Sequence, residues 1–517
     1  MPRMTLSRRR FLASGTAMTA ALATPSILRA QSAPIFEHGV QSGDVRTGSG
    51  MIWTRTDRPA KVMMEVSTTE DFANARRLPP MDALPQSDFA VKRLVDGLPS
   101  DQDIFYRFTA QDLSDVNAIS DPVTGHFRTA PTARRDVRFV WSGDTAGQGY
   151  GIDEAGMRTY ATMHQHEPDF FIHSGDTIYA DGPLHEDEVT AADGATFKNT
   201  VLTEAKSKVA ETLDEFRGQW KYNMMDEHVR ALSAAVPTFY QWDDHEVTNN
   251  WSASKVLGDA YTEKNIALLA ARSARAFHEL TPISYTPAEP GRIYRKINYG
   301  PMLDIFFLDL RSYRGPNNDG MSGEITEESR VLGAEQLAWL KRELANSTAT
   351  WKVIACDMPI GVVVWDNWAD QSGVEAVANG DGGAPKGREL EFAELLRFIK
   401  VANIRNTVWL TADVHYTAAH YYNPEKAQFQ DFEPFWEFVS GPLHAGTFGP
   451  NALDMTFGPE ERFVKAPAEG QANLPPSSGL QFFGLVDIDG DTEQMTVRLM
   501  DVADTELWSI TLDPQRA

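Results

Sequence analysis

The sequence has almost no cysteine, a shortage of basic residues relative to acidic ones, and no long apolar run. One cysteine, Cys356, among 517 residues excludes an internal disulfide and a zinc-thiolate cluster. Any metal site must therefore be built from oxygen and imidazole ligands. The 48 Lys and Arg residues against 72 Asp and Glu residues give a net charge of −24, which would repel a nucleic-acid backbone, so nucleic-acid binding is not expected.

The length and the apolar content set the scale of the fold. A chain of 517 residues is too long to fold around one ordinary hydrophobic core, so we expect a large catalytic domain with an appended module. Hydrophobic residues make up 42% of the chain, which is enough to bury a sizeable core and excludes intrinsic disorder.

Residues 1–30 have the pattern of an export signal. The basic segment Ser7-Arg8-Arg9-Arg10-Phe11-Leu12 precedes a mildly apolar run, and Ala30 is a small residue suited to cleavage. Polar residues and Pro25 interrupt the run, whereas a membrane anchor needs about 20 firmly apolar residues. The segment resembles a twin-arginine signal, which implies contact with the twin-arginine export machinery, a periplasmic or extracellular location and no stable transmembrane anchor.

Two patterns of secondary structure divide the rest of the chain. Residues 31–130 contain short strands separated by turn residues and no long helical period, which predicts an N-terminal β-sandwich domain. In residues 136–517 strands alternate with helices, which predicts an α/β catalytic domain that includes the C-terminal strands. A C-terminal hairpin around Asp489-Gly490 is expected at the edge of its sheet. The expected helices are Glu154–Gln165, Thr203–Leu232, Glu263–Leu280 and Gly333–Leu344.

Four short segments share one design, in which an apolar strand runs into a turn that carries carboxylates. Open α/β sheets place their ligands at such strand ends. Acidic and imidazole groups gathered there would repel one another or be costly to bury without cations between them. Because hard cations prefer carboxylate oxygen and one carboxylate can bridge two ions, the set predicts a multi-metal site. The segments are Ser142-Gly143-Asp144, Ser174-Gly175-Asp176-Thr177-Ile178-Tyr179, Trp242-Asp243-Asp244-His245-Glu246 and Thr411-Ala412-Asp413-Val414-His415.

These segments and several others resemble one family. The sequence is similar to the PhoD-type alkaline phosphatases and phosphodiesterases of the calcineurin-like metallophosphoesterase superfamily, relatives of the purple acid phosphatases. The resemblance covers nearly the whole mature chain, and the string Asp243-Asp244-His245-Glu246-Val247-Thr248-Asn249-Asn250-Trp251 is its most specific part. It implies an N-terminal β-sandwich followed by a two-sheet sandwich flanked by helices, and a metal-dependent phosphoester hydrolase.

The resemblance also implies a role for each motif residue. Asp144 would bind the first metal, Asp176 would bridge, and Tyr179 lies where relatives bind ferric iron through a phenolate. Asp244 would hold the second metal, and His245 would act as general acid or transition-state donor. The ligand set is completed by Asp413 and His415, and Asn249 and Asn250 are candidates for phosphate contacts.

The identity of the metals stays open. Some relatives present a cysteine thiolate to iron in the first motif, where this chain has Asp144, and Cys356 has the surroundings of a small buried apolar residue. The Asp, Tyr and His set suits ferric iron and the surplus of carboxylates suits calcium, while zinc, manganese and magnesium remain alternatives.

A few further residues have two possible roles. Arg311 and Arg314 follow an apolar strand and are candidates for a catalytic clamp on a phosphate or for structural ion pairs. Asp357 is a turn residue or an additional ligand, and His173 is expected to be a packed core histidine. His444 has no assigned role.

The functional prediction is therefore a secreted metal-dependent phosphoesterase that hydrolyses phosphate monoesters, diesters or both. One alternative is a phospholipase D-like phosphodiesterase, since some relatives have that activity. A distant alternative is a non-catalytic, calcium-stabilised periplasmic protein, against which His245 and His415 argue because calcium sites are normally all-oxygen. Oligomeric state and pH optimum are not predicted.

Overall fold

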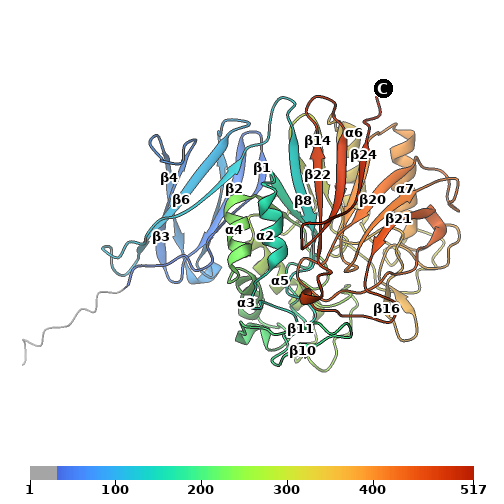
Figure 1. Cartoon of the computed structure of the whole chain (residues 1–517), viewed down its shortest axis with the longest axis horizontal. Coiled ribbons are helices and arrows are strands. Elements are labelled where there is room, and N and C mark those ends of the chain that lie inside the picture. The colour runs from blue at the N-terminus through green and yellow to red at the C-terminus, as the bar shows by residue number, and fades with distance from the viewer. Residues whose placement is uncertain (1–31, 517) are drawn as a thin grey trace, which may run out of the picture.

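The computed structural model describes residues 32–516, so the expected export signal lies outside the described residues. The described part begins with two antiparallel sheets, with strand orders β1-β2-β5 and β4-β3-β6-β7 (Figure 1). Apolar side chains from both sheets, such as Ile52 and Phe108, pack between them, which confirms the predicted N-terminal β-sandwich. The strands are β1 (Val40–Arg46), β2 (Ser49–Arg55), β3 (Ala60–Ser67), β4 (Arg76–Ala83), β5 (Ala90–Asp96), β6 (Asp103–Asp112) and β7 (Val123–Arg128).

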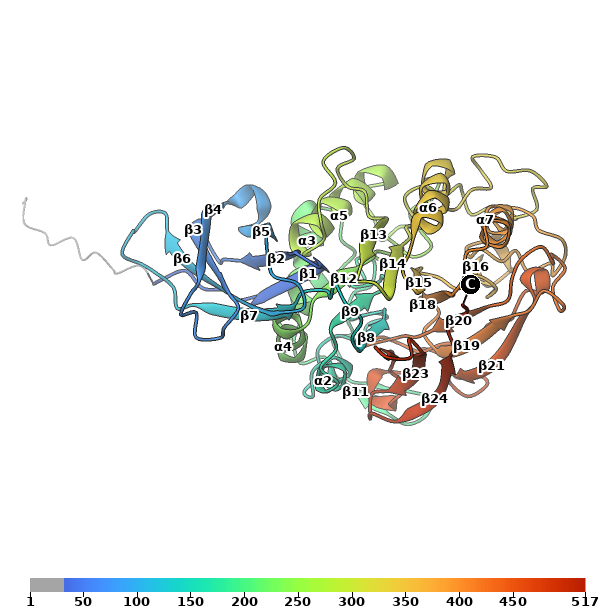
Figure 2. The same ribbon diagram turned by 90° about the horizontal axis from the view of Figure 1, so that it is seen from above.

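The rest of the chain forms two larger sheets that pack face to face (Figure 2). The first has the order β12-β9-β8-β22-β23-β24 and the second the order β13-β14-β15-β18-β20-β19-β21. The strands of the first are β8 (Val137–Ser142), β9 (Phe170–His173), β12 (Thr238–Tyr240), β22 (Phe482–Ile488), β23 (Met495–Asp501) and β24 (Glu506–Leu512). Those of the second are β13 (Arg295–Asn298), β14 (Leu303–Phe307), β15 (Trp351–Ala355), β18 (Thr407–Thr411), β19 (Thr417–Tyr422), β20 (Phe435–Val439) and β21 (Pro459–Lys465).

Strand alternation gives each sheet two apolar faces. In β15, Val353 and Ala355 point into the core between the sheets, whereas Ile354 packs on the outer face with helix residues. Helices α6 and α7 cover the outer face of the second sheet, and α2 and α4 cover that of the first. The helices are α2 (Arg158–Gln165), α3 (Leu213–Asn223), α4 (Glu227–Ala235), α5 (Ile266–Leu280), α6 (Ala334–Asn346) and α7 (Glu389–Val401). The predicted two-sheet sandwich with flanking helices is confirmed.

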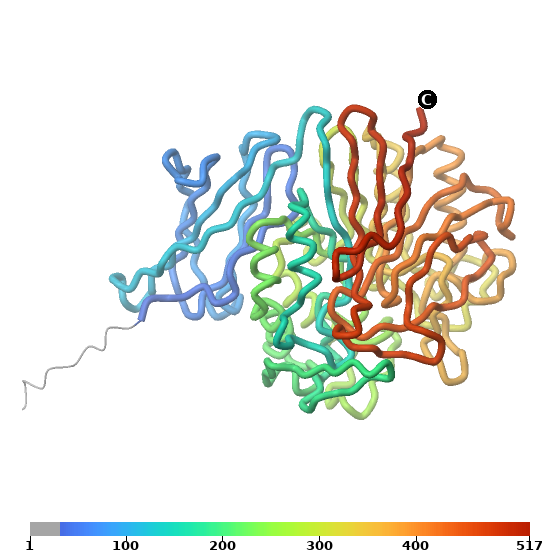
Figure 3. Tube along the Cα trace, in the orientation of Figure 1, coloured from blue at the N-terminus to red at the C-terminus, as the bar shows by residue number. Residues whose placement is uncertain are grey.

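The prediction of a single helix over Thr203–Leu232 is wrong, because two N-cap residues divide the segment into the separate helices α3 and α4. Thr212 forms a capping box with Glu215 and starts α3. Asp226 then accepts hydrogen bonds from the backbone N–H groups of His228 and Val229 and starts α4. The C-terminal hairpin is present, but both of its strands lie inside the sheet: β22 pairs with β8, β23 pairs with β24, and β24 forms one edge (Figure 3).

Two short hairpins extend from this framework. They are β10 (Val189–Thr190) with β11 (Thr196–Phe197) and β16 (Trp365–Asn367) with β17 (Ser372–Val374). Over residues 32–516, none of the helices is long and apolar enough to cross a membrane.

Candidate metal centre

The four carboxylate turns meet where the carboxyl ends of parallel strands from the two sheets come together. Strands β8, β9 and β12 run parallel in one sheet and lead to Asp144, Asp176 and the pair Asp243-Asp244. Strand β18 lies parallel to β15 in the other sheet and leads to Asp413. The predicted grouping of these residues at strand ends therefore has a simple topological cause.

The backbone at these turns adopts a conformation that non-glycine residues rarely take. The φ angles of Asp144, Asp176 and Asp413 are 67°, 50° and 69°. At Gly175, with a φ of +103°, an added Cβ would lie 2.6 Å from the Cβ of Asp243, so glycine lets the second and third turns approach closely. Backbone strain of this kind concentrates at functional sites.

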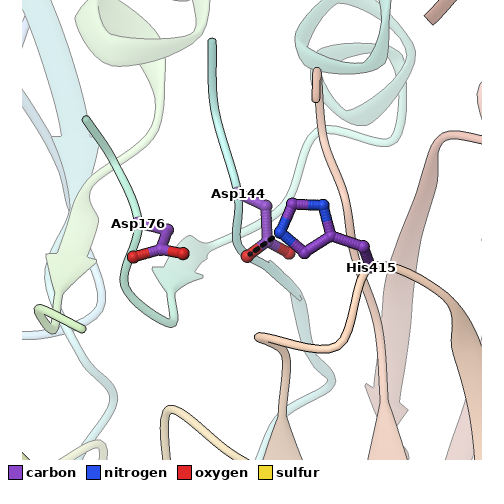
Figure 4. Close-up of side chains that lie close together, drawn as sticks. All are labelled: Asp144, Asp176 and His415. Atoms are coloured by element: carbon purple, nitrogen blue, oxygen red, sulfur yellow. Dashed lines mark ion pairs between the residues drawn. The ribbon is translucent and has the colours of Figure 1, made fainter. Parts of the chain in front are cut away.

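The side chains form three overlapping groups whose ligand atoms lie within 4.8 Å of one another. Asp176 belongs to two of these groups, and so does Asp244, which is how the groups overlap. Figure 4 shows the first group, in which His415 Nε2 lies 3.6 Å from Asp144 Oδ1. The same Nε2 is 2.8 Å from the hydroxyl oxygen of Tyr179. The groups are Asp144, Asp176 and His415; Asp176, Asp244 and His245; and Asp243, Asp244 and Asp413.

The electrostatics of the cluster fit a metal centre. Both carboxylate oxygens of Asp144, Oδ2 of Asp243 and Oδ1 of Asp244 are buried without a hydrogen-bond partner among the described residues. Burial and the neighbouring carboxylates raise the pKa of Asp144 and of Asp176 well above the usual range. Burial lowers the pKa of His415 to about 4, so its ring is neutral, as a ligand must be. Cations would supply the partners that these oxygens lack.

Glu246 ties two of the turns together. Its carboxylate accepts hydrogen bonds from the backbone N–H groups of Asp176 at 3.0 Å, Thr177 at 2.7 Å and Asp243 at 2.8 Å. Burial raises its pKa to about 8 in spite of these bonds. Glu246 thus sets the spacing of the turns after β9 and β12.

Arg311 lies beneath the carboxylates and is 1% exposed. Its guanidinium forms ion pairs with Asp243 and Glu375 and lies 3.5 Å from Asp413 Oδ1. Asp357, which follows β15, lies 3.6 Å from the same guanidinium and is fully buried. One buried cation therefore compensates part of the charge of the acidic cluster.

His245 lies on the open side of the cluster. Its Nδ1 is 2.7 Å from Asp181 Oδ1, and the other oxygen of Asp181 accepts a hydrogen bond from the backbone of Asn249. Its ring packs on that of Tyr179 with a centroid distance of 4.2 Å. Burial lowers the pKa of His245, but the charges of Asp181 and Asp244 outweigh it and raise the value to about 9.

A cleft of about 740 Å³ opens onto this cluster. Asp176, Asp244 and His415 contribute to its floor, and Asn249 and Asn250 line it as well. A cavity of this size accommodates a small-molecule substrate.

With this geometry established, comparison with known proteins decides the family. Residues 139–499 match the family model described as PhoD-like phosphatase, and residues 21–131 match the model for the N-terminal domain of PhoD-like phosphatases. The chain belongs to the PhoD-like phosphatase family.

One curated protein is similar to this PhoD-like chain in sequence, and two solved structures are similar to it in fold. It is 32% identical over 403 residues to alkaline phosphatase D of Bacillus subtilis (strain 168), a match that covers 74% of this chain and 64% of the Bacillus protein. The solved structure of PhoD superposes with a TM-score of 0.68 at 23% identity, covering 93% of this chain and 90% of the other. A purple acid phosphatase from seeds of yellow lupin (Lupinus luteus) superposes with a TM-score of 0.55 at 12% identity, covering 93% and 74%.

The remaining residues singled out in the PhoD-like sequence lie around the cluster or away from it. His173 is packed in the core, with its ring nitrogens near the hydroxyls of Thr145 and Thr177. His444 lies beside the first carboxylate turn, where its backbone N–H donates to the carbonyl oxygen of Asp144 at 3.1 Å, and its Nε2 lies 2.6 Å from the carbonyl oxygen of Gly151. Cys356 is fully buried under the helices of the second sheet, and Arg314 pairs with Glu375 at 3.1 Å.

Sequence analysis missed three residues that shape the site: Asp181, Glu246 and Glu375. Glu246 was part of a motif and received no role. Asp181 lies five residues after Asp176, a spacing that signals proximity only if the intervening loop is known to turn back. Glu375 lies in a glycine-rich segment with no periodic pattern, and no sequence signal would have identified it.

Proposed function

We propose that this chain is a metal-dependent phosphoesterase that hydrolyses phosphate monoesters, diesters or both. The observation that carries the proposal is the set of three overlapping ligand groups, with unpartnered carboxylate oxygens, at the floor of an open cleft. Membership of the PhoD-like phosphatase family supports it, and the PhoD-like alkaline phosphatase D of B. subtilis is a relative.

The ligands of the proposed centre divide into two sets that share Asp176. One set is Asp144, Asp176 and His415, with Tyr179 beside His415. The other combines Asp176, Asp244 and Asp413 from the two groups that share Asp244, whose remaining members, His245 and Asp243, are paired with Asp181 and Arg311. The phenol and imidazole of the first set suit ferric iron, and the all-carboxylate character of the second suits calcium. Zinc, manganese and magnesium are the alternatives that metal analysis has to distinguish.

Metal ions held by these residues would supply positive charge to attract the phosphoryl group and to acidify a water molecule. The protein's own contribution begins with His245. Its Nδ1 is held by the Asp181 carboxylate, which leaves Nε2 to carry a proton for the departing alkoxide oxygen. Asn249 and Asn250 both line the cleft. The amide of Asn249 is available to bind phosphoryl oxygens, whereas the side-chain nitrogen of Asn250 is directed to the carbonyl oxygens of Trp365 and Asp366. Arg311 is buried below the carboxylates, so we assign it to charge balance and positioning.

The direct test is hydrolysis of a chromogenic phosphate monoester and a chromogenic diester by the same preparation, before and after chelation, with metal content recorded. Hydrolysis that chelation abolishes and metal restores is the expected result. The ratio of the two rates distinguishes an alkaline phosphatase from a phospholipase D-like phosphodiesterase. No hydrolysis of either ester by fully metallated protein would contradict the proposal.

We also propose export through the twin-arginine pathway, on the basis of the segment Arg8-Arg9-Arg10-Phe11-Leu12. The test is cell fractionation of the wild-type chain and of the R8K/R9K/R10K variant. The wild-type protein should reach the periplasm or medium and the variant should remain in the cytoplasm. Equal export of both would contradict twin-arginine export.

A further inference from the structure

The cleft has apolar lining residues as well as the acidic groups of its floor. Five such residues line it, and we call them together the apolar wall: Val364, Trp368, Val414, Phe448 and Pro450. The wall starts at the proposed metal centre, because the Phe448 ring packs edge-on against the ring of His415 with a centroid distance of 5.5 Å. It includes Trp368, which is 54% exposed.

Trp368 lies in the turn of the β16–β17 hairpin, and both strands of this hairpin are attached to residues of the site. On its first strand, β16, the carbonyl oxygens of Trp365 and Asp366 lie 3.5 and 3.3 Å from the side-chain nitrogen of Asn250. Immediately after its second strand, β17, the buried Glu375 forms ion pairs with Arg311 and Arg314. The same residues that surround the metal centre therefore hold the base of the hairpin, and Trp368 is presented from a supported scaffold.

The charged side chains that line the cleft are carboxylates, apart from His245, which is paired with Asp181. Within residues 32–516, the side chains that line it include Asp181 and Asp366 but no lysine or arginine. Lys255 lies close by, but its Nζ is paired with Asp366 at 2.8 Å. Arg311 is buried beneath the acids and does not line the cleft. A second phosphate or a carboxylate on the leaving alcohol would therefore meet carboxylates, and the cations near it within residues 32–516, His245 and Lys255, are already paired with Asp181 and Asp366.

From the wall and the charges together, we propose that this site selects phosphoesters whose leaving alcohol is uncharged and apolar, with Trp368 as a specificity-determining residue. The inference rests on the proposed phosphoesterase function. Apolar contact with the exposed indole stabilises the bound ester, and the absence of unpaired lining cations disfavours anionic alcohols such as those released from phosphate polymers.

The test compares hexyl phosphate with its ω-carboxylate analogue, 6-phosphonooxyhexanoate, which has the same chain length and one more negative charge. Each is measured as the monoester and as the methyl diester, so that a preference between ester classes does not hide the preference for the alcohol. We expect kcat/KM to be at least about 10-fold higher for the hexyl compound. The W368A variant should lower kcat/KM for the hexyl ester about 5- to 10-fold, mainly through KM, and leave glycerol phosphate unchanged.

Two controls and one binding readout accompany the kinetics. W368F should retain most of the preference, and Y285A, which removes another exposed aromatic ring outside the cleft, should have no effect. Binding of hexylphosphonate, measured by calorimetry, should weaken in W368A as much as KM rises.

The outcomes are distinct. Equal turnover of the hexyl and ω-carboxylate esters, or unchanged kinetics in W368A, would overturn the inference. A change of molecular mass in W368A by light scattering, with unchanged kinetics, would instead make the wall a contact with a second copy of the chain. If no ester in the series is hydrolysed by metallated protein, the proposed function fails and this inference fails with it. A preference for long-chain over short-chain esters only in vesicles would reassign the wall to a membrane surface.

Discussion

Two sets of buried aspartates in this chain have opposite surroundings. Asp44, at the contact between the N-terminal sandwich and β13, has both oxygens bonded to Arg295 and a further bond from the backbone of Ser284. Asp144, equally buried, has no hydrogen-bond partner for either oxygen within the described chain. Burial raises the pKa of both, but Arg295 outweighs burial at Asp44 and lowers its pKa, whereas neighbouring carboxylates raise that of Asp144 further.

The comparison shows that burial of a carboxylate does not by itself indicate function. A buried acid with all its oxygens satisfied is part of the architecture, and here it joins β1 to β13 and, through Arg295, to the carbonyl of Tyr240 in β12. A buried acid with orphaned oxygens and like-charged neighbours is stable only with an added partner, which points to a metal. The predictions below test this distinction.

The largest effect is expected at the shared carboxylate. D176N should reduce turnover about 1000-fold or more, equivalent to about 4 kcal/mol of transition-state stabilisation, and should reduce bound metal. In chelator, the same variant should be at least as stable as the wild type, because it removes a buried like charge. Initial rates, metal analysis and urea unfolding on one preparation check all three, and full activity with full metal content in D176N would contradict the bridging assignment.

At Asp44 the effect should be on stability instead. D44N leaves Arg295 buried without its counter-ion and should cost about 3 to 5 kcal/mol of unfolding free energy, with metal content and turnover of the folded protein retained.

The same variant has a defined pH dependence. Since the folded-state pKa of Asp44 is lowered, its stabilisation is complete above the unfolded value of about 4 and is lost as the pH falls through the folded value. The stability difference between wild type and D44N should therefore be constant from about pH 5 to 8 and shrink below about pH 4. Urea unfolding curves across this range provide the measurement, and a difference that grows toward acid pH would show that Asp44 is not charged in the folded state.

An intermediate effect is expected at Asp181, a partnered acid that acts through another residue. D181N keeps the shape but weakens the hold on His245 Nδ1, so turnover should fall about 10- to 100-fold with metal content unchanged. Because the charge of Asp181 helps to raise the pKa of His245, the limb of the pH–rate profile that reports loss of the His245 proton should also move to lower pH. Loss of metal in D181N would instead make Asp181 part of the ligand shell.

The smallest effect is expected at Cys356. This side chain is buried beside Asp357 but faces the apolar layer under the helices of the second sheet. C356A should cost about 1 kcal/mol of stability through the small cavity it leaves and should not alter turnover or metal content. A loss of metal in this variant would extend the centre to sulfur.

The fold and the core of the site were accessible from sequence because both depend on local patterns. Strand runs followed by Asp144, Asp176, Asp244 and Asp413 placed these residues at strand ends, and parallel strands in a sandwich bring such ends together. Pairing partners across long separations were not accessible: β22 lies next to β8 although more than 300 residues separate them, and nothing local in either strand specifies that neighbour.

The supporting residues were missed for a related reason. The role of Asp181 depends on the fold of the loop that returns it to His245, and that of Glu375 on the packing of a hairpin against Arg311. The sequence did not decide whether Asp357 is a turn residue or a metal ligand, because its position before Met358-Pro359 fits a turn equally well. Its fully buried position beside Arg311 becomes visible only when β14 and β15 lie side by side.

The most direct test of the central claim is anomalous X-ray scattering from crystals of the active protein, recorded across the absorption edges of iron and zinc, and at long wavelength for calcium. The account predicts at least two anomalous peaks. One should lie among Asp144, Asp176, Tyr179 and His415, and one among Asp176, Asp244 and Asp413, each about 2.0 to 2.6 Å from its ligand atoms. Active crystals without anomalous density at these carboxylates would contradict the account.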